Sequence, residues 1–255
     1  MTAMLSVRDL GKTFGAVVAA RDITLDVPPR QTVGIIGANG AGKTTFINLI
    51  TGHLRPTSGT IRFEDRDITG RPSREITRLG VSRSFQVAQI FSSLTVFENL
   101  CAAAAIAAGK GGAWAAFLPL DRPEIHAAAT AAMELFGIAR HRNVRAATLP
   151  QGVRKLLDIA MAVVGSPRVL LLDEPTSGIA VEEKFGVMET VMAALKSRRL
   201  TVLFVEHDME IVARFADRVL AFYDGTVIAD GAPAVALADP RVQSLISGTG
   251  GRRHA

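Results

Sequence analysis

The stretch Gly37-Ala-Asn-Gly-Ala-Gly-Lys43-Thr44-Thr45 decides how this chain folds. A β-branched run at residues 32–36 precedes it, and a helical pattern follows from Lys43 to about Thr51, with Gly52 at the expected stop. Glycines let the backbone curl so that successive N–H groups point at phosphate oxygens, and the following helix directs its positive end at the same anion. The stretch therefore predicts a P-loop nucleotide site.

Two side chains of this loop have their own chemistry. Lys43 adds a positive charge for the β- and γ-phosphates of ATP, and the Thr44 hydroxyl suits Mg²⁺. We therefore expect ATP and Mg²⁺ as cofactors. The nucleotide-binding residues predicted from the loop are Gly37, Asn39, Gly40, Ala41, Gly42, Lys43, Thr44 and Thr45.

A second signal is the apolar segment Val169–Asp173, which is followed directly by Glu174. An apolar run without alternation is typical of a strand buried on both faces, and such a strand delivers its terminal carboxylates to the sheet edge. Asp173 would hold Mg²⁺, directly or through water, and Glu174 would act as general base toward the attacking water. The alternative is an acidic strand end at a turn.

Three further residues are candidates with weaker individual signals. His207 follows the apolar segment Thr201–Val205 and is placed to reach a γ-phosphate, although a lone histidine is usually a surface or capping residue. Gln86, after a strand-like run at 81–85, would contact Mg²⁺ or water through its amide oxygen, so the predicted metal set is Thr44, Gln86 and Asp173. Phe14 would stack on adenine, or else belong to the core.

The order of the segments predicts an α/β fold. Apolar strands alternate with helical patterns, which favours a mostly parallel sheet, while short strands at 5–7 and 23–27 indicate a small antiparallel β part near the N-terminus. Residues 95–165 have mostly helical composition, which predicts an inserted α-helical lobe. We expect one domain over residues 1–255, with a nucleotide-binding core at 1–86 and 166–255 and the lobe at 87–165.

Composition narrows the function classes. The chain has 255 residues, 48% of them hydrophobic, and a formal net charge of +5. The basic residues are dispersed, and only one Trp and one Tyr are present to stack on bases, so no nucleic-acid partner is expected. Residues 96–120 contain Glu98, Lys110, several glycines and many alanines, which favours a soluble helical region over a membrane span.

The motifs, taken in order, resemble the ATP-binding subunit of an ABC transporter over nearly the whole chain. An aromatic residue near the start, the P-loop, a glutamine, a signature, Asp-Glu and a histidine follow one another in that family's order. Within the family, Gly80-Val-Ser-Arg-Ser-Phe-Gln86, Leu94-Thr-Val-Phe-Glu-Asn-Leu100 and Val205-Glu-His-Asp-Met209 are similar to importers of branched-chain amino acids and related solutes.

The resemblance implies roles and partners. Phe14 would be the adenine platform, Gln86 would lead the loop facing the membrane partner, and Glu174 and His207 would be the catalytic pair. The helical lobe would dock on membrane permease subunits, with a second ATPase subunit and, indirectly, an extracytoplasmic solute-binding protein completing the system. The chain would then be peripheral, at the cytoplasmic face of the cell membrane.

The sequence departs from the family at its signature segment, residues 149–153. The usual Leu-Ser-Gly-Gly-Gln is replaced by Leu149, Pro150, Gln151, Gly152 and Val153. The signature caps the ATP bound by the opposing subunit. A proline is tolerated in the first turn of a helix, so the helix direction is expected to persist without the serine hydroxyl. Ala180 also stands where the family often has Asp or Asn. A heterodimer of ATPase subunits is therefore expected; the alternative is that Gly152 and the helix N-terminus suffice and the departure is neutral.

Two other functions remain open from the sequence. One is a soluble ABC-type ATPase that acts on nucleic acid or ribosomes, which the basic charge alone supports. The other is a regulatory subunit that binds ATP with little turnover. The altered signature favours it, whereas Glu174 and His207 oppose it.

Overall fold

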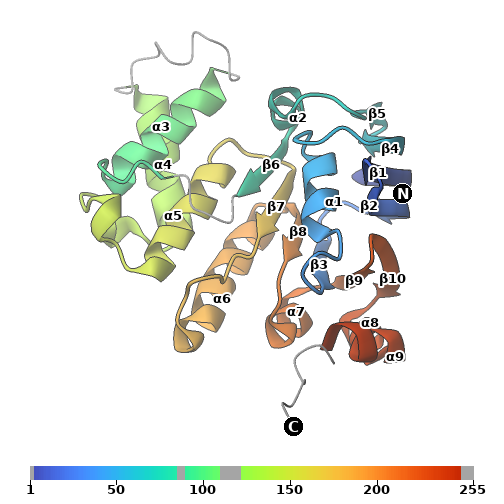
Figure 1. Cartoon of the computed structure of the whole chain (residues 1–255). Coiled ribbons are helices and arrows are strands. Elements are labelled where there is room, and N and C mark those ends of the chain that lie inside the picture. Colours follow the sequence, from blue (N-terminus) through green and yellow to red (C-terminus); the bar gives the residue numbers. More distant parts are fainter. Residues whose placement is uncertain (1–2, 85–89, 110–121, 248–255) are drawn as a thin grey trace. The chain divides into compact units, whose positions relative to one another are not determined.

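The computed structural model describes residues 3–84, 90–109 and 122–247 (Figure 1). The chain forms two compact units. The first unit combines Met1–Ile76 with Thr201–Ala255, and the second unit is Thr77–Leu200. Helix α2 (Ser73–Leu79) crosses the boundary along the chain.

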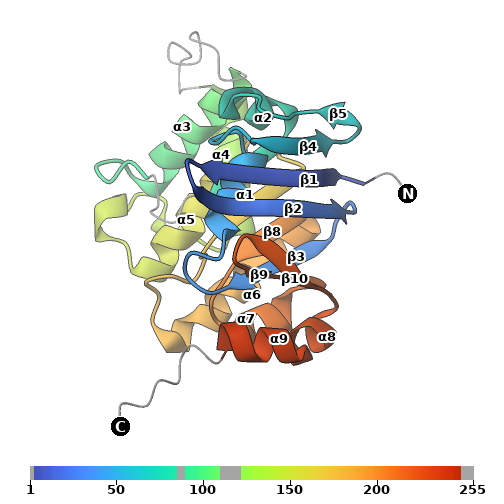
Figure 2. The same ribbon diagram turned by 45° about the vertical axis from the view of Figure 1, so that its right-hand side comes forward.

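The first unit contains an antiparallel sheet in the order β2-β1-β4-β5. Its long central strand β1 (Leu5–Phe14) places Leu5 opposite Val27 of one neighbour and opposite Phe63 of the other. Figure 2 shows the two longest strands side by side. The predicted antiparallel part is present. Both N-terminal strands are longer than the predicted segments 5–7 and 23–27, and they meet at the turn that joins them. The other members are β2 (Val17–Val27), β4 (Ser58–Phe63) and β5 (Arg66–Asp67).

Strand β3 (Thr32–Gly37) organises a second group of strands in the first unit. It pairs in parallel with β8 (Thr201–Val205) and with β9 (Arg218–Tyr223), while β10 (Thr226–Gly231) returns antiparallel to β9. All residues of β3 and β8 are buried, which explains why their sequences are apolar without alternation. The remaining helical elements are α1 (Lys43–Ile50), α7 (Met209–Phe215), α8 (Pro233–Ala238), α9 (Pro240–Val242) and η4 (Gln243–Ser247).

The second unit pairs the short strand β6 (Val81–Ser84) in parallel with β7 (Val169–Asp173). A capping box opens its first long helix, because the Thr95 hydroxyl accepts from Glu98 N and the Glu98 carboxylate accepts from Thr95 N. Its helices are α3 (Val96–Ala108), α4 (Pro123–Leu135), α5 (Gln151–Val163) and α6 (Val181–Ser197), with short turns η2 (Ala139–His141) and η3 (Ala146–Thr148).

The elements agree with the predicted fold class, since parallel strands, an antiparallel part and a helical middle are all present. The division at residues 86 and 166 stays a prediction, because the compact second unit also contains β6, β7 and α6. In the part of the chain that the structure describes, no helix is both long and apolar enough to cross a membrane.

Candidate nucleotide site

The predicted P-loop lies between the end of β3 and the start of α1 (Figure 1). Gly42 precedes the helix in the left-handed region, with φ of 98°, and a Cβ there would lie 2.6 Å from the Ala19 carbonyl oxygen. A Cβ on Gly37 would lie 2.5 Å from the Phe222 carbonyl oxygen. Both positions therefore require glycine, because the Cβ of any other residue would clash with one of these carbonyl oxygens.

The middle of the loop is fixed by backbone hydrogen bonds. Ala41 N donates to Ala38 O at 3.1 Å, and Gly225 N donates to Ala41 O at 3.1 Å. Ala41 is buried, whereas Asn39 and Gly40 are exposed at the tip of the loop. The loop is thus fixed by hydrogen bonds at Ala41 and exposed to solvent at its tip. An anion can therefore reach the N–H groups at the helix start.

Lys43 is buried under this loop, and its ammonium group points back at it. Nζ donates to Gly37 O at 2.6 Å and to Ala38 O at 3.0 Å. Thr44, the next residue, is exposed, and Thr45 is half-buried. The positive charge of Lys43 therefore lies at the loop. A bound phosphate would replace the two carbonyl oxygens as the acceptor of the Nζ hydrogen bonds.

His207 reaches the same sheet edge as the P-loop. Strands β3 and β8 are parallel neighbours with Ile35 opposite Val205, so Gly37 and His207 each follow that pair by two residues. His207 is exposed, and its backbone N donates to the buried carboxylate of Glu206 at 3.2 Å. The structure thus brings this predicted residue and the P-loop together within the first unit.

Phe14 ends β1 with 48% of its surface exposed, so it is not a core residue. The Lys12 Nζ lies 4.9 Å from the centre of its ring. A cation at this distance is attracted to the negative face of an aromatic ring. Gln86, which was also predicted from a weak sequence signal, lies outside the described residues.

The predicted carboxylates belong to the second unit, at the end of β7. Asp173 is buried, and Glu174 follows it in a half-buried position with φ of 47°. A non-glycine residue in the left-handed region is uncommon and is found mostly where function or a tight turn requires it. Ser177 N donates to Glu174 O at 3.1 Å, which closes the turn immediately after the strand.

Asp173 has a buried cationic partner that the sequence analysis did not select. The Arg83 Nη2 donates to Asp173 Oδ2 at 2.6 Å, and the two side chains are 10% and 5% exposed. Arg83 lies in β6, opposite Leu171 of β7. The available signal was an arginine inside the strand-like run at 81–85, because a charge that a strand buries requires a partner.

The donor chemistry fits Mg²⁺. A threonine hydroxyl and an aspartate carboxylate are the hard oxygen ligands that this cation prefers. Arg83 uses one carboxylate oxygen of Asp173, and a carboxylate offers about four lone-pair positions, so the other oxygen can still face a cation. Among the described residues no group of three or more acidic, His or Cys side chains gathers, and Mg²⁺ at phosphate sites commonly takes only one or two protein ligands.

The signature segment opens helix α5 of the second unit. Pro150 stands at the N-cap, immediately before the first turn, and Arg154 N donates to Pro150 O at 3.0 Å. No side-chain hydrogen bond caps this helix start. Proline is thus compatible with the helix, as the sequence indicated, and it leaves the first N–H groups of α5 without the hydroxyl that a serine would bring.

Of the other signature residues, Leu149 and Gly152 are packed into the second unit. Gly152 lets α5 approach α6 closely, because a Cβ there would lie 3.1 Å from Val187 Cγ2. Leu149 is buried, Val153 is half-buried, and Gln151 is exposed. The segment therefore keeps its helix start and its close packing while its polar side chains differ from the family pattern.

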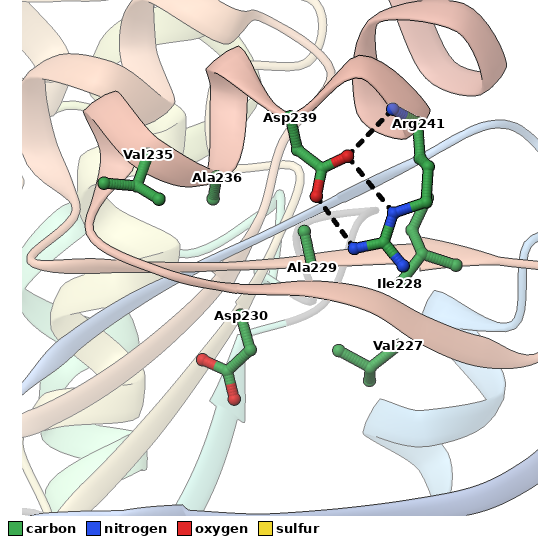
Figure 3. Close-up of a pocket in the computed structure, with 8 residues that line it drawn as sticks. All are labelled: Val227, Ile228, Ala229, Asp230, Val235, Ala236, Asp239 and Arg241. Carbon is green, nitrogen blue, oxygen red and sulfur yellow. Dashed lines mark hydrogen bonds and ion pairs between the residues drawn. The ribbon is translucent and has the colours of Figure 1, made fainter.

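A cavity of about 290 Å³ lies elsewhere in the first unit, beside β10, α8 and α9 (Figure 3). The Arg241 guanidinium donates to the Asp239 carboxylate at 2.8 Å, and this bond lowers the pKa of Asp239. No predicted nucleotide-site residue lines it, Asp239 and Arg241 are paired with each other, and Asp230 is paired with Arg218. The lining residues are Val227, Ile228, Ala229, Asp230, Val235, Ala236, Asp239 and Arg241.

Comparison with known proteins gives a consistent result. The ABC transporter family model matches residues 20–177, more than half of the chain. The chain is 36% identical over 235 residues to the high-affinity branched-chain amino acid transport ATP-binding protein LivG of Escherichia coli strain K12, which covers 90% of this chain and 92% of LivG. It is 35% identical over 234 residues to BraF of Pseudomonas aeruginosa, a protein described in the same terms, with the same coverage.

A solved structure agrees with the fold. The ADP conformation of an ATP-binding cassette of an ABC transporter matches with a TM-score of 0.85 and 28% identity, over 97% of this chain and all of that one. Together with the P-loop geometry and the strand-end carboxylates, these similarities settle the family. The chain belongs to the ABC transporter family, among its ATP-binding subunits.

Proposed function

We propose that this chain is the ATP-hydrolysing, energy-coupling subunit of a membrane importer for branched-chain amino acids or related small solutes. Its similarity to LivG and BraF over about nine-tenths of each chain supports the solute class. The single observation that carries the ATPase part is the P-loop, in which Lys43 and the start of α1 face the same open loop.

The residues divide the work of ATP binding. The loop N–H groups and Lys43 hold the β- and γ-phosphates, and the exposed Phe14 ring offers a platform for adenine. Thr44 and Asp173, with Gln86, would hold Mg²⁺. When bound, that ion neutralises charge on the phosphates.

Hydrolysis requires a base and an orienting group. Glu174 would take a proton from the attacking water, and its left-handed backbone conformation stands immediately after the strand that ends at Asp173. His207, at the sheet edge shared with the P-loop, would donate to the γ-phosphate or the attacking water. ATP-driven closure of two ATPase subunits, hydrolysis and reopening would then power the permease.

The second ATPase subunit is proposed to be a different chain. In such a pair, each composite site would be formed by the P-loop of one subunit and the signature of the other. Pro150 stands at the start of α5 without a side-chain cap, so a homodimer would lack a signature hydroxyl at both composite sites. In a heterodimer, this chain's P-loop and Glu174 would meet a partner with an intact signature. The remaining partners would be permease subunits and, indirectly, an extracytoplasmic solute-binding protein, with this chain at the cytoplasmic face of the membrane.

One alternative has a specific observation in its favour. The same uncapped start of α5 suits a subunit that binds ATP and turns it over slowly. Turnover in the assembled complex separates the two functions, because a regulatory subunit would leave the rate unchanged when its Glu174 is replaced by Gln.

The proposal is tested by isolating the chain from its native membranes and identifying the proteins that copurify. Permease subunits and a second ATPase chain are expected, and solute-stimulated ATP hydrolysis should appear with branched-chain amino acids. Recovery with ribosomes or nucleic acid in place of a permease would overturn the importer function.

A further inference from the structure

We propose that Arg83 is a positioning residue for Asp173, which orients the carboxylate so that one oxygen remains directed at the Mg²⁺ of bound ATP. This inference rests on the proposed metal role of Asp173. It gives a role to Arg83, which stands in the segment Gly80–Gln86 but is not one of the predicted site residues, and the contact behind it lies within the second unit.

The strand register brings the two residues together. In the parallel pair of β6 and β7, Arg83 lies opposite Leu171. Side chains two residues apart in a strand share a face, so Leu171 and Asp173 project to the same side. The arginine is long enough to pass along that face to the carboxylate at the strand end, where Nη2 donates to Oδ2 at 2.6 Å.

Burial makes this contact a restraint. With 10% and 5% of their side chains exposed, neither group is extensively solvated, and a buried charge without a partner is costly. The guanidinium is planar and rigid, so its hydrogen bond from Nη2 to Oδ2 restricts the carboxylate to few orientations. A lysine at this position would retain the charge and lose the planar donor group.

Two opposing effects of Arg83 on the metal can be weighed. Its positive charge repels a divalent cation, whereas its hydrogen bond fixes the ligand. Mg²⁺ demands near-ideal octahedral geometry, and outer partners that orient its ligands typically contribute about 10- to 100-fold in metal affinity. We therefore expect orientation to outweigh repulsion.

The experiment uses the full chain and ADP, so that no turnover is involved. ADP affinity is measured by calorimetry in EDTA and at increasing Mg²⁺ for Arg83→Met, Arg83→Lys, Asp173→Asn and the Arg83→Met/Asp173→Asn double variant. Arg218→Met is the matched control, because Arg218 pairs with Asp230 within the first unit and is also partly buried. Circular dichroism establishes folding, and Arg83→Lys carries the test if Arg83→Met does not fold.

The expected result is selective. Arg83→Met should raise the Mg²⁺ concentration for half-maximal ADP binding about 10- to 100-fold and leave affinity in EDTA unchanged, with partial rescue in Arg83→Lys. It should add nothing in the Asp173→Asn background. An unchanged or lowered Mg²⁺ requirement, an equal effect of Arg218→Met, or full additivity in the double variant would overturn the proposal. An Asp173→Asn chain with normal Mg²⁺ dependence would instead remove the metal assignment itself.

Discussion

The two helix starts of this chain that belong to ATP chemistry differ in how they are built. At the start of α1, function depends on backbone: Gly42 adopts a conformation that favours glycine, and Lys43 bonds the loop carbonyls. At the start of α5, Pro150 precedes a helix with no side-chain cap. The first would hold the chain's own nucleotide, and the second would face the nucleotide of another subunit.

The difference shows which half of a composite site tolerates change. A P-loop glycine cannot be replaced without displacing a backbone atom such as the Ala19 carbonyl oxygen. A signature serine contributes one hydroxyl, and the helix start remains when proline replaces it. On the proposed function, the chain would therefore retain the half that binds and cleaves ATP, while its contribution to the opposite site would be reduced.

Replacing Glu174 with Gln should have the largest effect, because it removes the base from the intact half. The amide keeps the shape and cannot accept the proton, so turnover at the site that contains Glu174 should fall roughly 10²- to 10⁴-fold while ATP binding persists, and the complex should keep only the residual rate of its slower site. Steady-state hydrolysis and equilibrium ATP binding measure the two quantities. Near-normal turnover would exclude Glu174 as the base.

Replacing Lys43 with Ala should weaken ATP binding itself. Hydrogen bonds to charged groups contribute about 1.5–3 kcal/mol, which corresponds to roughly 10- to 100-fold in affinity. Direct titration with ATP checks this, with Lys196→Ala, an exposed lysine in the last turn of α6, as the control. Equal affinity of Lys43→Ala and the unaltered chain would contradict the P-loop assignment.

A third helix start sharpens the comparison, because α3 has the complete side-chain cap that α5 lacks. Replacing Thr95 with Ala should lower the free energy of unfolding by about 1 kcal/mol, and Thr95→Ser should restore most of it. Chemical denaturation measures both. If Thr95→Ala has no effect, side-chain caps contribute little to the stability of this unit, and the missing cap of α5 has no cost for folding.

The same cap has a defined pH dependence. The hydrogen bonds from Thr95 N and Oγ1 lower the pKa of Glu98. A carboxyl whose pKa is lower in the folded state stabilises above its unfolded value, near 4.5, and that contribution is lost as pH falls through the folded value. Unfolding measured at decreasing pH should show this loss in the unaltered chain and less of it in Glu98→Gln.

Restoring the signature should have the smallest effect. In a heterodimer, the Pro150→Ser/Val153→Gln chain improves only the slower site, so total turnover should rise by at most about twofold if each site can contribute equally. In a homodimer, both sites would gain the hydroxyl and the rise would be about tenfold or more. Hydrolysis by the purified complex distinguishes these outcomes.

The sequence predicted the elements whose pattern is local. Strands β3, β7 and β8 are continuous apolar runs, and their bounds lie within one residue of the prediction. The extension of β1 to Phe14 was not predicted, because residues 8–14 are mostly polar and do not alternate with apolar ones, and their pairing with β2 and β4 is a long-range property.

The candidate site shows the same limit. Lys43, Asp173 and His207 stand in recognisable motifs, so local sequence was enough to select them. The Arg83–Asp173 contact joins residues 90 positions apart, and its existence depends on the parallel register of β6 with β7. The N-cap position of Pro150 could likewise be assigned only once the first residue of α5 was known, and a sequence pattern defines such a boundary only within a few residues.

The central claim is that the two composite sites are unequal, with this chain supplying the working P-loop and Glu174. The most direct test replaces the glutamate after the strand-end aspartate with Gln in one ATPase chain of the native complex at a time. The account predicts that Glu174→Gln removes nearly all hydrolysis, whereas the matching change in the second chain leaves at least about half. Equal losses, or a native complex in which this is the only ATPase chain and the restored signature changes nothing, would contradict it.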